Sequence, residues 1–179
     1  MCIRDRELDY DERTCELASI AGYMHDIGNM INRVGHAQNG ALLAFQILTR
    51  MGMDPKEIAQ VVSAIGHHDE SSAAPVNELA AALLLADKSD ARRSRVRNRN
   101  DRTVIDRDIH DRVNFAVHGT KLSVRKEEKT IYLNMEIDIE ICPVMDYFEI
   151  FLGRMLLCRR AADFLGMSFA LIINGSRLL

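Results

Sequence analysis

The stretch Tyr23-Met-His-Asp-Ile-Gly-Asn29 places a histidine and an aspartate at the end of a predicted helix. That helix spans about residues 12–27, because apolar residues recur there at helical spacing. Gly28 and Asn29 then end it, as residues that follow helix C-termini commonly do. His25 and Asp26 therefore stand together where a helix gives way to a turn.

Further residues of types that can bind metals stand near the next three predicted helices. His36 lies just before the first, the run His-His-Asp-Glu at residues 67–70 ends the second, and Asp87 follows two leucines on the third. Asp54-Pro55-Lys56-Glu57 is a strong start signal for the second, with an N-cap residue and proline at the first helical position. These helices are predicted at about residues 37–51, 55–68 and 76–93.

Helical spacing separates the members of this set into buried and exposed positions. His68 shares a face with Val61, Ala64 and Ile65, which is the apolar face, whereas His67 lies nearer water. Asp87 lies on the core side, where a carboxylate is costly unless it is paired or coordinates a metal. Imidazole together with carboxylate suits Mn, Fe, Co, Ni or Zn, and suits Mg less well.

Each of these residues taken alone has an ordinary structural explanation. A single buried histidine is more often a satisfied core residue than a ligand, and Asp87 could pair with Arg92 or Arg93. Asp26 could be a turn residue, and His36 a polar residue at a helix start. Because all of them fall at helix ends or on core faces, the joint pattern favours a divalent-metal site. That site comprises His25, Asp26, His36, His68 and Asp87.

This ordered set resembles the HD superfamily of metal-dependent phosphohydrolases, and specifically small bacterial HD-domain proteins. The resemblance covers almost the whole chain, including Ile172-Ile-Asn-Gly175. It implies that His25, Asp26 and Asp87 hold a first metal ion. It also implies that Asp26, His36 and His68, with His67 as a further candidate, hold a second. The metals would activate water to attack a phosphoester.

The chain departs from the family pattern at one point. The pattern begins with an additional histidine on an upstream helix, and no histidine precedes His25 here. Either the chain is truncated at its N-terminus, which we favour, or its first metal position is incomplete. In both cases we expect the first metal to bind weakly and catalysis to be impaired.

Three cations follow the last candidate ligand. Lys88, Arg92 and Arg93 could hold a substrate phosphate, since arginine suits bidentate phosphate contacts. The alternative is a solvated helix end favoured by the helix dipole. Lys88 joins His25 and Asp26 as a catalytic candidate. The arginines of residues 92–107 lack interleaved aromatic residues and are diluted by aspartates, which argues against a nucleic-acid partner.

In the last third of the chain the spacing of apolar residues changes from the helical repeat to alternation. A short helix at about 106–117 precedes two alternating stretches, 121–125 and 130–139, that predict a β-hairpin. A long apolar helix at about 144–165 and a strand at 168–173 follow. We expect an α+β, mainly α fold: an HD-type helical bundle with a small antiparallel sheet and a C-terminal helix packed on it. Its parts are a helical HD domain (1–118) and a β-hairpin, helix and strand (119–179), within one compact unit.

Composition limits the class of protein. The chain has 179 residues, a net charge of −3 and four cysteines with no CxxC pair, which predicts a cytoplasmic protein with reduced thiols. We expect no signal peptide and no membrane partner. The predicted function is hydrolysis of a nucleotide or other small phosphorylated molecule; the alternative is a non-catalytic metal- or nucleotide-binding regulatory module. The C-terminal sheet and helix could form a homodimer surface or a substrate lid.

Overall fold

The computed structural model describes residues 8, 10–96 and 108–179. Its helices and strands follow the predicted order, with a last short strand that the sequence pattern did not indicate. The elements are α2 (Glu12–Met24), η1 (Ile27–Met30), α3 (His36–Arg50), α4 (Pro55–Gly66), α5 (Glu78–Lys88), η2 (Arg93–Arg95), α7 (Ile109–Ala116), β1 (Val117–Arg125), β2 (Thr130–Ile137), α8 (Val144–Phe164), β3 (Ser168–Ile173) and β4 (Ser176–Arg177).

Side-chain caps fix where the helices begin. The Asp11 carboxylate accepts from the backbone N–H of Thr14 at 2.8 Å at the start of α2. Asp54 caps α4 in the same way, with Pro55 at its first position, as the sequence predicts. These bonds satisfy backbone donors that the first helical turn leaves without partners.

The predicted helix over residues 76–93 is too long at its C-terminal end. α5 stops at Lys88, and Arg92 has extended backbone angles. The chain leaves the helix because later segments bind it: Asn114 Oδ1 accepts from the backbone N–H of Arg92, and the Thr120 hydroxyl donates to the Ala91 carbonyl. Residues 89–92 thus connect α5 to α7 and β1.

The sheet has the strand order β1-β2-β3-β4 and is mixed. β1 pairs with β2 antiparallel, as the hairpin prediction requires, but β2 pairs with β3 in parallel. The expectation of a wholly antiparallel sheet is therefore wrong. The reason is α8, which carries the chain back along the sheet so that β3 starts at the same end as β2; parallel neighbours need such a crossover. The α+β, mainly α class is confirmed.

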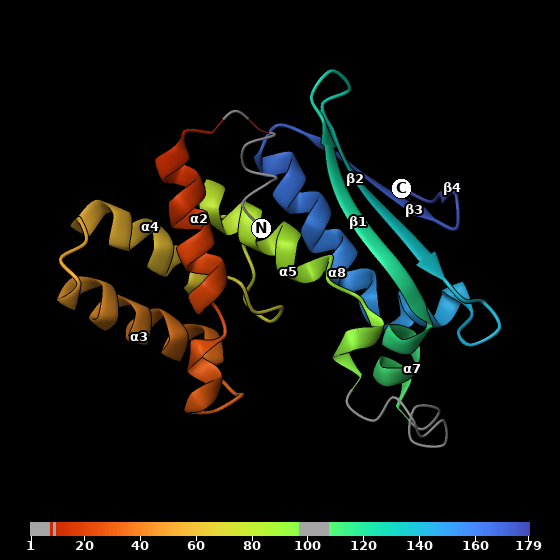
Figure 1. The fold of residues 1–179 in the computed structure, drawn as a ribbon, viewed down its shortest axis with the longest axis horizontal. Coiled ribbons are helices and arrows are strands. Elements are labelled where there is room, and N and C mark those ends of the chain that lie inside the picture. The colour runs from red at the N-terminus through yellow and green to blue at the C-terminus, as the bar shows by residue number, and fades with distance from the viewer. Residues whose placement is uncertain (1–7, 9, 97–107) are drawn as a thin grey trace.

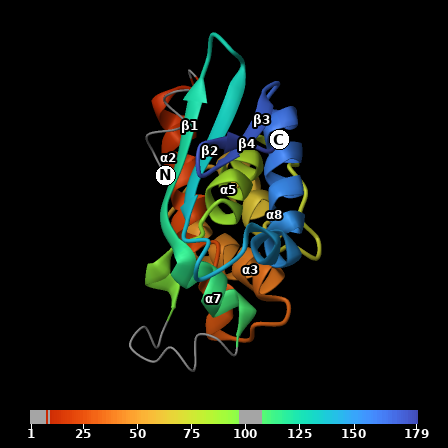
Figure 2. The ribbon, with the colours of Figure 1, turned by 90° about the vertical axis from the view of Figure 1, so that its right-hand side faces the viewer.

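Two apolar clusters form the core, and α5 belongs to both. Leu79, Ala80 and Leu83 pack with α2, α3 and α4, whereas Leu84 and Leu85 pack with α7, α8 and the sheet. Figure 1 shows α5 and α8 side by side, with α2, α3 and α4 on one side of them and the strands on the other. Figure 2 views the molecule from the side of the strands. The boundary between residues 118 and 119 stays a prediction; β1 begins at Val117.

Three of the cysteines are buried: Cys15, Cys142 and Cys158. Burial raises the pKa of Cys158 to about 12, so that thiol is largely unreactive at neutral pH. Cys2 lies outside the described residues. None of the helices within the described residues combines the length and apolar character that a bilayer span requires.

Candidate metal centre

The candidate ligands stand at the ends of four helices and in the last turn of a fifth. His25 ends α2 and Asp26 begins η1, in the turn that Gly28 continues. His36 is the first residue of α3 and His68 follows the end of α4, while Asp87 lies in the last turn of α5. Side chains at helix ends can converge without interrupting the packing of the helices themselves.

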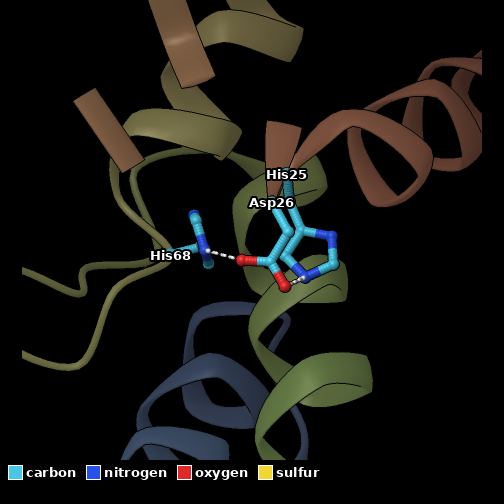
Figure 3. Close-up of side chains that lie close together, drawn as sticks. All are labelled: His25, Asp26 and His68. Atoms are coloured by element: carbon cyan, nitrogen blue, oxygen red, sulfur yellow. Dashed lines mark ion pairs between the residues drawn. The ribbon is translucent and has the colours of Figure 1, made fainter. Parts of the chain in front are cut away.

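The Asp26 carboxylate lies at the centre of this group. Its Oδ2 is 3.4 Å from Nε2 of His25, and its Oδ1 is 3.5 Å from Nε2 of His36 and 3.7 Å from Nε2 of His68. Asn29 donates to Oδ1 at 2.8 Å and helps to orient the carboxylate. Figure 3 shows the carboxylate between the rings of His25 and His68, with one oxygen directed at each.

The orientation of all three imidazoles is fixed by the backbone. In each ring Nδ1 bonds the carbonyl three residues earlier, at 2.8 Å in His25, 3.0 Å in His36 and 2.6 Å in His68. A carbonyl only accepts, so Nδ1 carries the proton and Nε2 of a neutral ring presents its lone pair to Asp26. This is the arrangement in which a histidine binds a metal ion through Nε2.

The pair His36 and His68 gives the clearest test of whether a cation fits. Their Nε2 atoms are 3.2 Å apart, and the rings are 4% and 2% exposed. Two neutral rings whose Nδ1 atoms carry the protons point lone pair at lone pair, and a positive ion between them relieves that repulsion. Four ligands at about 2.1 Å from zinc lie about 3.4 Å apart in a tetrahedron. The distances among Asp26, His36 and His68 match that spacing.

Asp87 is a second carboxylate close to His25. Its Oδ1 is 3.9 Å from Nε2 of His25, and its Oδ2 accepts from Lys88 Nζ at 2.6 Å. The ion pair of Asp87 is therefore with Lys88, which is 6% exposed, rather than with Arg92 or Arg93. One ligand atom from each of His25, Asp26 and His68 lies within 4.8 Å of the others. After the two ligand sets that the family resemblance implies, we refer to His25, Asp26 and Asp87 as one half of the centre and to Asp26, His36 and His68 as the other.

The local electrostatics keep the carboxylates ionised. The neighbouring imidazoles of His25 and His68 hold the pKa of Asp26 far below its usual value. Burial alone would raise the pKa of Asp87, but the charge and the hydrogen bond of Lys88, together with smaller contributions from the nearby histidines, make the net shift downward. Burial likewise lowers the pKa of His25, yet its contacts with Asp26 and the Gly22 carbonyl and the charges of Asp26 and Asp87 together make the net shift upward. A cation that binds His25 must displace the proton that this pair favours.

Three residues predicted for the site lie elsewhere. His67 is directed back at its own helix, with Nδ1 bonded to the Ser63 carbonyl at 2.9 Å. Arg92 is exposed and pairs with Asp90, and Arg93 donates to the Phe115 carbonyl at 2.7 Å while lying over the Phe115 ring. Among the described residues, no contact joins these three side chains to Asp26 and its histidines.

The structure also brings Asp69 close to the centre, a member of the run at residues 67–70 that the sequence pattern did not assign as a ligand. Oδ1 of Asp69 is 3.9 Å from Nε2 of His36. Burial would raise the pKa of Asp69, but a hydrogen bond from Ser71 and the charges of His36 and Lys88 make the net shift downward. Its position directly after His68 was the available signal, although helical spacing cannot show where a side chain beyond the end of α4 points.

The neighbours His67 and His68 provide a matched pair of substitutions. We expect His68→Ala to weaken metal binding by more than about tenfold, since even indirect supporting residues change metal affinity by that factor. His67→Ala should leave metal affinity unchanged, because the histidines that approach Asp26 within the described residues are His25, His36 and His68. Isothermal titration of each metal-stripped variant with Co²⁺ measures both. Equal losses in the two variants would contradict the placement of His67 outside the centre.

A comparison with known protein families finds one match. The family described as HD domain matches residues 5–95, which is just over half of the chain. This range contains the candidate ligands in both halves of the centre. No curated protein and no solved structure matches the chain.

Proposed function

Because the chain belongs to the HD-domain family, we propose that it is a metal-dependent phosphohydrolase that cleaves a phosphoester of a nucleotide or other small phosphorylated molecule. One observation carries the proposal: three histidine Nε2 atoms, each oriented by a backbone bond to Nδ1, converge on the two oxygens of Asp26. This arrangement presents lone pairs and negative charge to the same small volume. Such a volume suits a divalent cation.

Each half of the centre would bind one cation. His25, Asp26 and Asp87 would hold one ion, and Asp26, His36 and His68 a second, with Asp26 shared. Bound divalent ions lower the pKa of water and stabilise the charge that develops on a phosphoryl group. Asp26 would fix the separation of the two positions, since each of its oxygens faces a different half.

Lys88 would have two roles in this centre: it pairs with Asp87, and it attracts the phosphate of the substrate. Its ammonium is buried and bonds Asp87 at 2.6 Å, so it offsets the charge of that carboxylate and holds its other oxygen toward His25. We propose that the same positive charge attracts the phosphoryl oxygens of the substrate.

The experiment is hydrolysis of a panel of nucleotides and p-nitrophenyl phosphoesters with Mn²⁺, Co²⁺, Ni²⁺ or Mg²⁺ added to the metal-stripped chain. We expect product release that needs metal, stops with chelator and returns when metal is restored. Lys88→Ala should reduce turnover by about tenfold or more, and Arg92→Ala, on an exposed side chain paired with Asp90, should not. The same panel is run on a form extended by a helix that carries the additional upstream histidine of the family pattern, and absence of metal-dependent turnover in that form would refute the phosphohydrolase proposal.

A second candidate function is a regulatory module that binds metal or nucleotide without turning it over. The positions of Arg92 and Arg93 favour it, because their guanidinium groups contact Asp90 and Phe115 instead of joining Lys88 in a phosphate clamp. Equilibrium binding of nucleotide to the metal-loaded chain, with no product formed, would distinguish this function from hydrolysis.

A further inference from the structure

A carboxylate outside the predicted ligand set faces the half of the centre formed by Asp26, His36 and His68. Asp69 lies in the loop after α4, directly beyond His68. Its Oδ1 is 3.9 Å from Nε2 of His36, and its side chain is 31% exposed. His36 directs that same nitrogen at Asp26 and at His68. Asp69 thus approaches the one atom of His36 that is able to bind a metal.

The loop holds this carboxylate in a defined orientation. Oδ2 accepts from the Ser71 hydroxyl at 2.5 Å, and the backbone N–H of Ser72 donates to the Asp69 carbonyl at 3.0 Å. These two bonds close a turn and commit Oδ2 to Ser71, which leaves Oδ1 directed at His36. Supporting hydrogen bonds of this kind commonly orient the carboxylates that bind metals.

The next residue anchors the loop to the rest of the protein. Glu70 accepts from Arg154 Nε of α8 at 2.6 Å, and the Arg154 guanidinium lies over the Phe151 ring. Glu70 therefore points at α8 while Asp69 points at the histidines. The two adjacent acidic residues therefore have different partners, Ser71 for Asp69 and Arg154 for Glu70. Glu70 can serve as a matched control for Asp69.

We propose that Oδ1 of Asp69 is a fourth protein ligand of the cation held by Asp26, His36 and His68. This inference rests on the metal centre of the proposed function and extends it. The ligand set would be two imidazoles and two carboxylates, which balances the charge of a divalent ion. Such a mixture favours Mn, Fe, Co or Zn over Mg.

The test is titration of the metal-stripped full chain with Co²⁺. Calorimetry measures the affinity of each binding step, and visible absorption reports the ligands of the bound ion. We expect Asp69→Asn to weaken one binding step by about tenfold or more and to change the Co²⁺ spectrum, because a charged ligand is lost. Ser71→Ala should weaken the same step less, since the carboxylate remains. Glu70→Gln should change neither the affinity nor the spectrum.

His36→Ala identifies the position concerned. If Asp69 and His36 bind the same ion, Asp69→Asn should have no further effect on Co²⁺ binding in the His36→Ala background. A variant Asp69→Asn that binds Co²⁺ with the affinity and spectrum of the wild type would overturn the inference and leave the metal centre intact. If the wild type binds no Co²⁺, the metal centre itself fails, and the role of Asp69 fails with it.

Discussion

Asp26→Ala is expected to remove bound metal from the protein and to bring phosphoester hydrolysis down to the rate without enzyme. The substitution deletes both oxygens around which the centre is arranged: Oδ2 facing His25, and Oδ1 facing His36 and His68. Residues that only support a ligand already change metal affinity by about 10–100-fold, so loss of a ligand shared by both halves should exceed that range. Metal content after dialysis and turnover with added Mn²⁺ or Co²⁺ measure the two effects.

The control for Asp26 is Asp90→Ala. Asp90 follows the end of α5 and pairs with Arg92 and Arg95, so its loss should leave metal content and turnover unchanged. Far-UV circular dichroism of both variants tests whether the helices persist. A folded Asp26→Ala variant with the metal content of the wild type would rule out the proposed centre.

Gly28→Ala is expected to produce a large loss of stability. A Cβ at this position would lie 2.0 Å from the His36 carbonyl oxygen and 2.6 Å from the Gly40 backbone nitrogen. Backbone atoms cannot move aside as a flexible side chain can, so η1 would have to separate from the start of α3. Overpacking of this kind costs about 3 kcal/mol or more, which corresponds to a fall in melting temperature of roughly 6–12 °C for a chain of this size.

The same substitution should also weaken metal binding, because η1 follows Asp26 directly and α3 begins with His36. The matched control is Gly153→Ala in α8, where, within the described part of the chain, no atom beyond the adjoining backbone of its own helix lies within 4 Å of the added carbon. That change should be neutral or stabilise the protein by about 0.4–1 kcal/mol, since alanine is the better helix former. Thermal unfolding measures both variants. Equal melting temperatures for Gly28→Ala and the wild type would show that η1 and α3 are not packed backbone to backbone.

Much of the fold follows from local signals. The start of α4 at Pro55 and the span of β3 over Ser168–Ile173 agree with the sequence pattern, because capping residues and apolar periodicity act over a few neighbouring positions. The end of α5 does not follow from such signals. It depends on Asn114 and Thr120, which bind the backbone from segments more than twenty residues away.

The direction of β3 is a second feature outside the reach of local patterns. Alternation of apolar and polar residues predicts a strand, but it carries no information about which neighbour the strand pairs with or in which sense. Pairing of β3 with β2 in parallel depends on α8 crossing the sheet, which is a property of the packed protein.

For the candidate site, the sequence by itself determined which residue types stand at which helix ends: a histidine and an aspartate after α2, a histidine at the start of α3, another after α4 and an aspartate in α5. It also predicted a buried His68 and a less buried His67 by extending the apolar face of α4 beyond Gly66, where the helix ends. These are local consequences of chain geometry.

Only the tertiary structure decided which of these side chains meet. It directs Nε2 of His25, His36 and His68 at Asp26, pairs Asp87 with Lys88, brings Asp69 to His36, and turns Arg93 toward Phe115. The physical reason is that the site lies between helix ends rather than on one helix. Distances across it depend on how closely α2, α3, α4 and α5 pack, and the sequence pattern of each helix describes only its own faces.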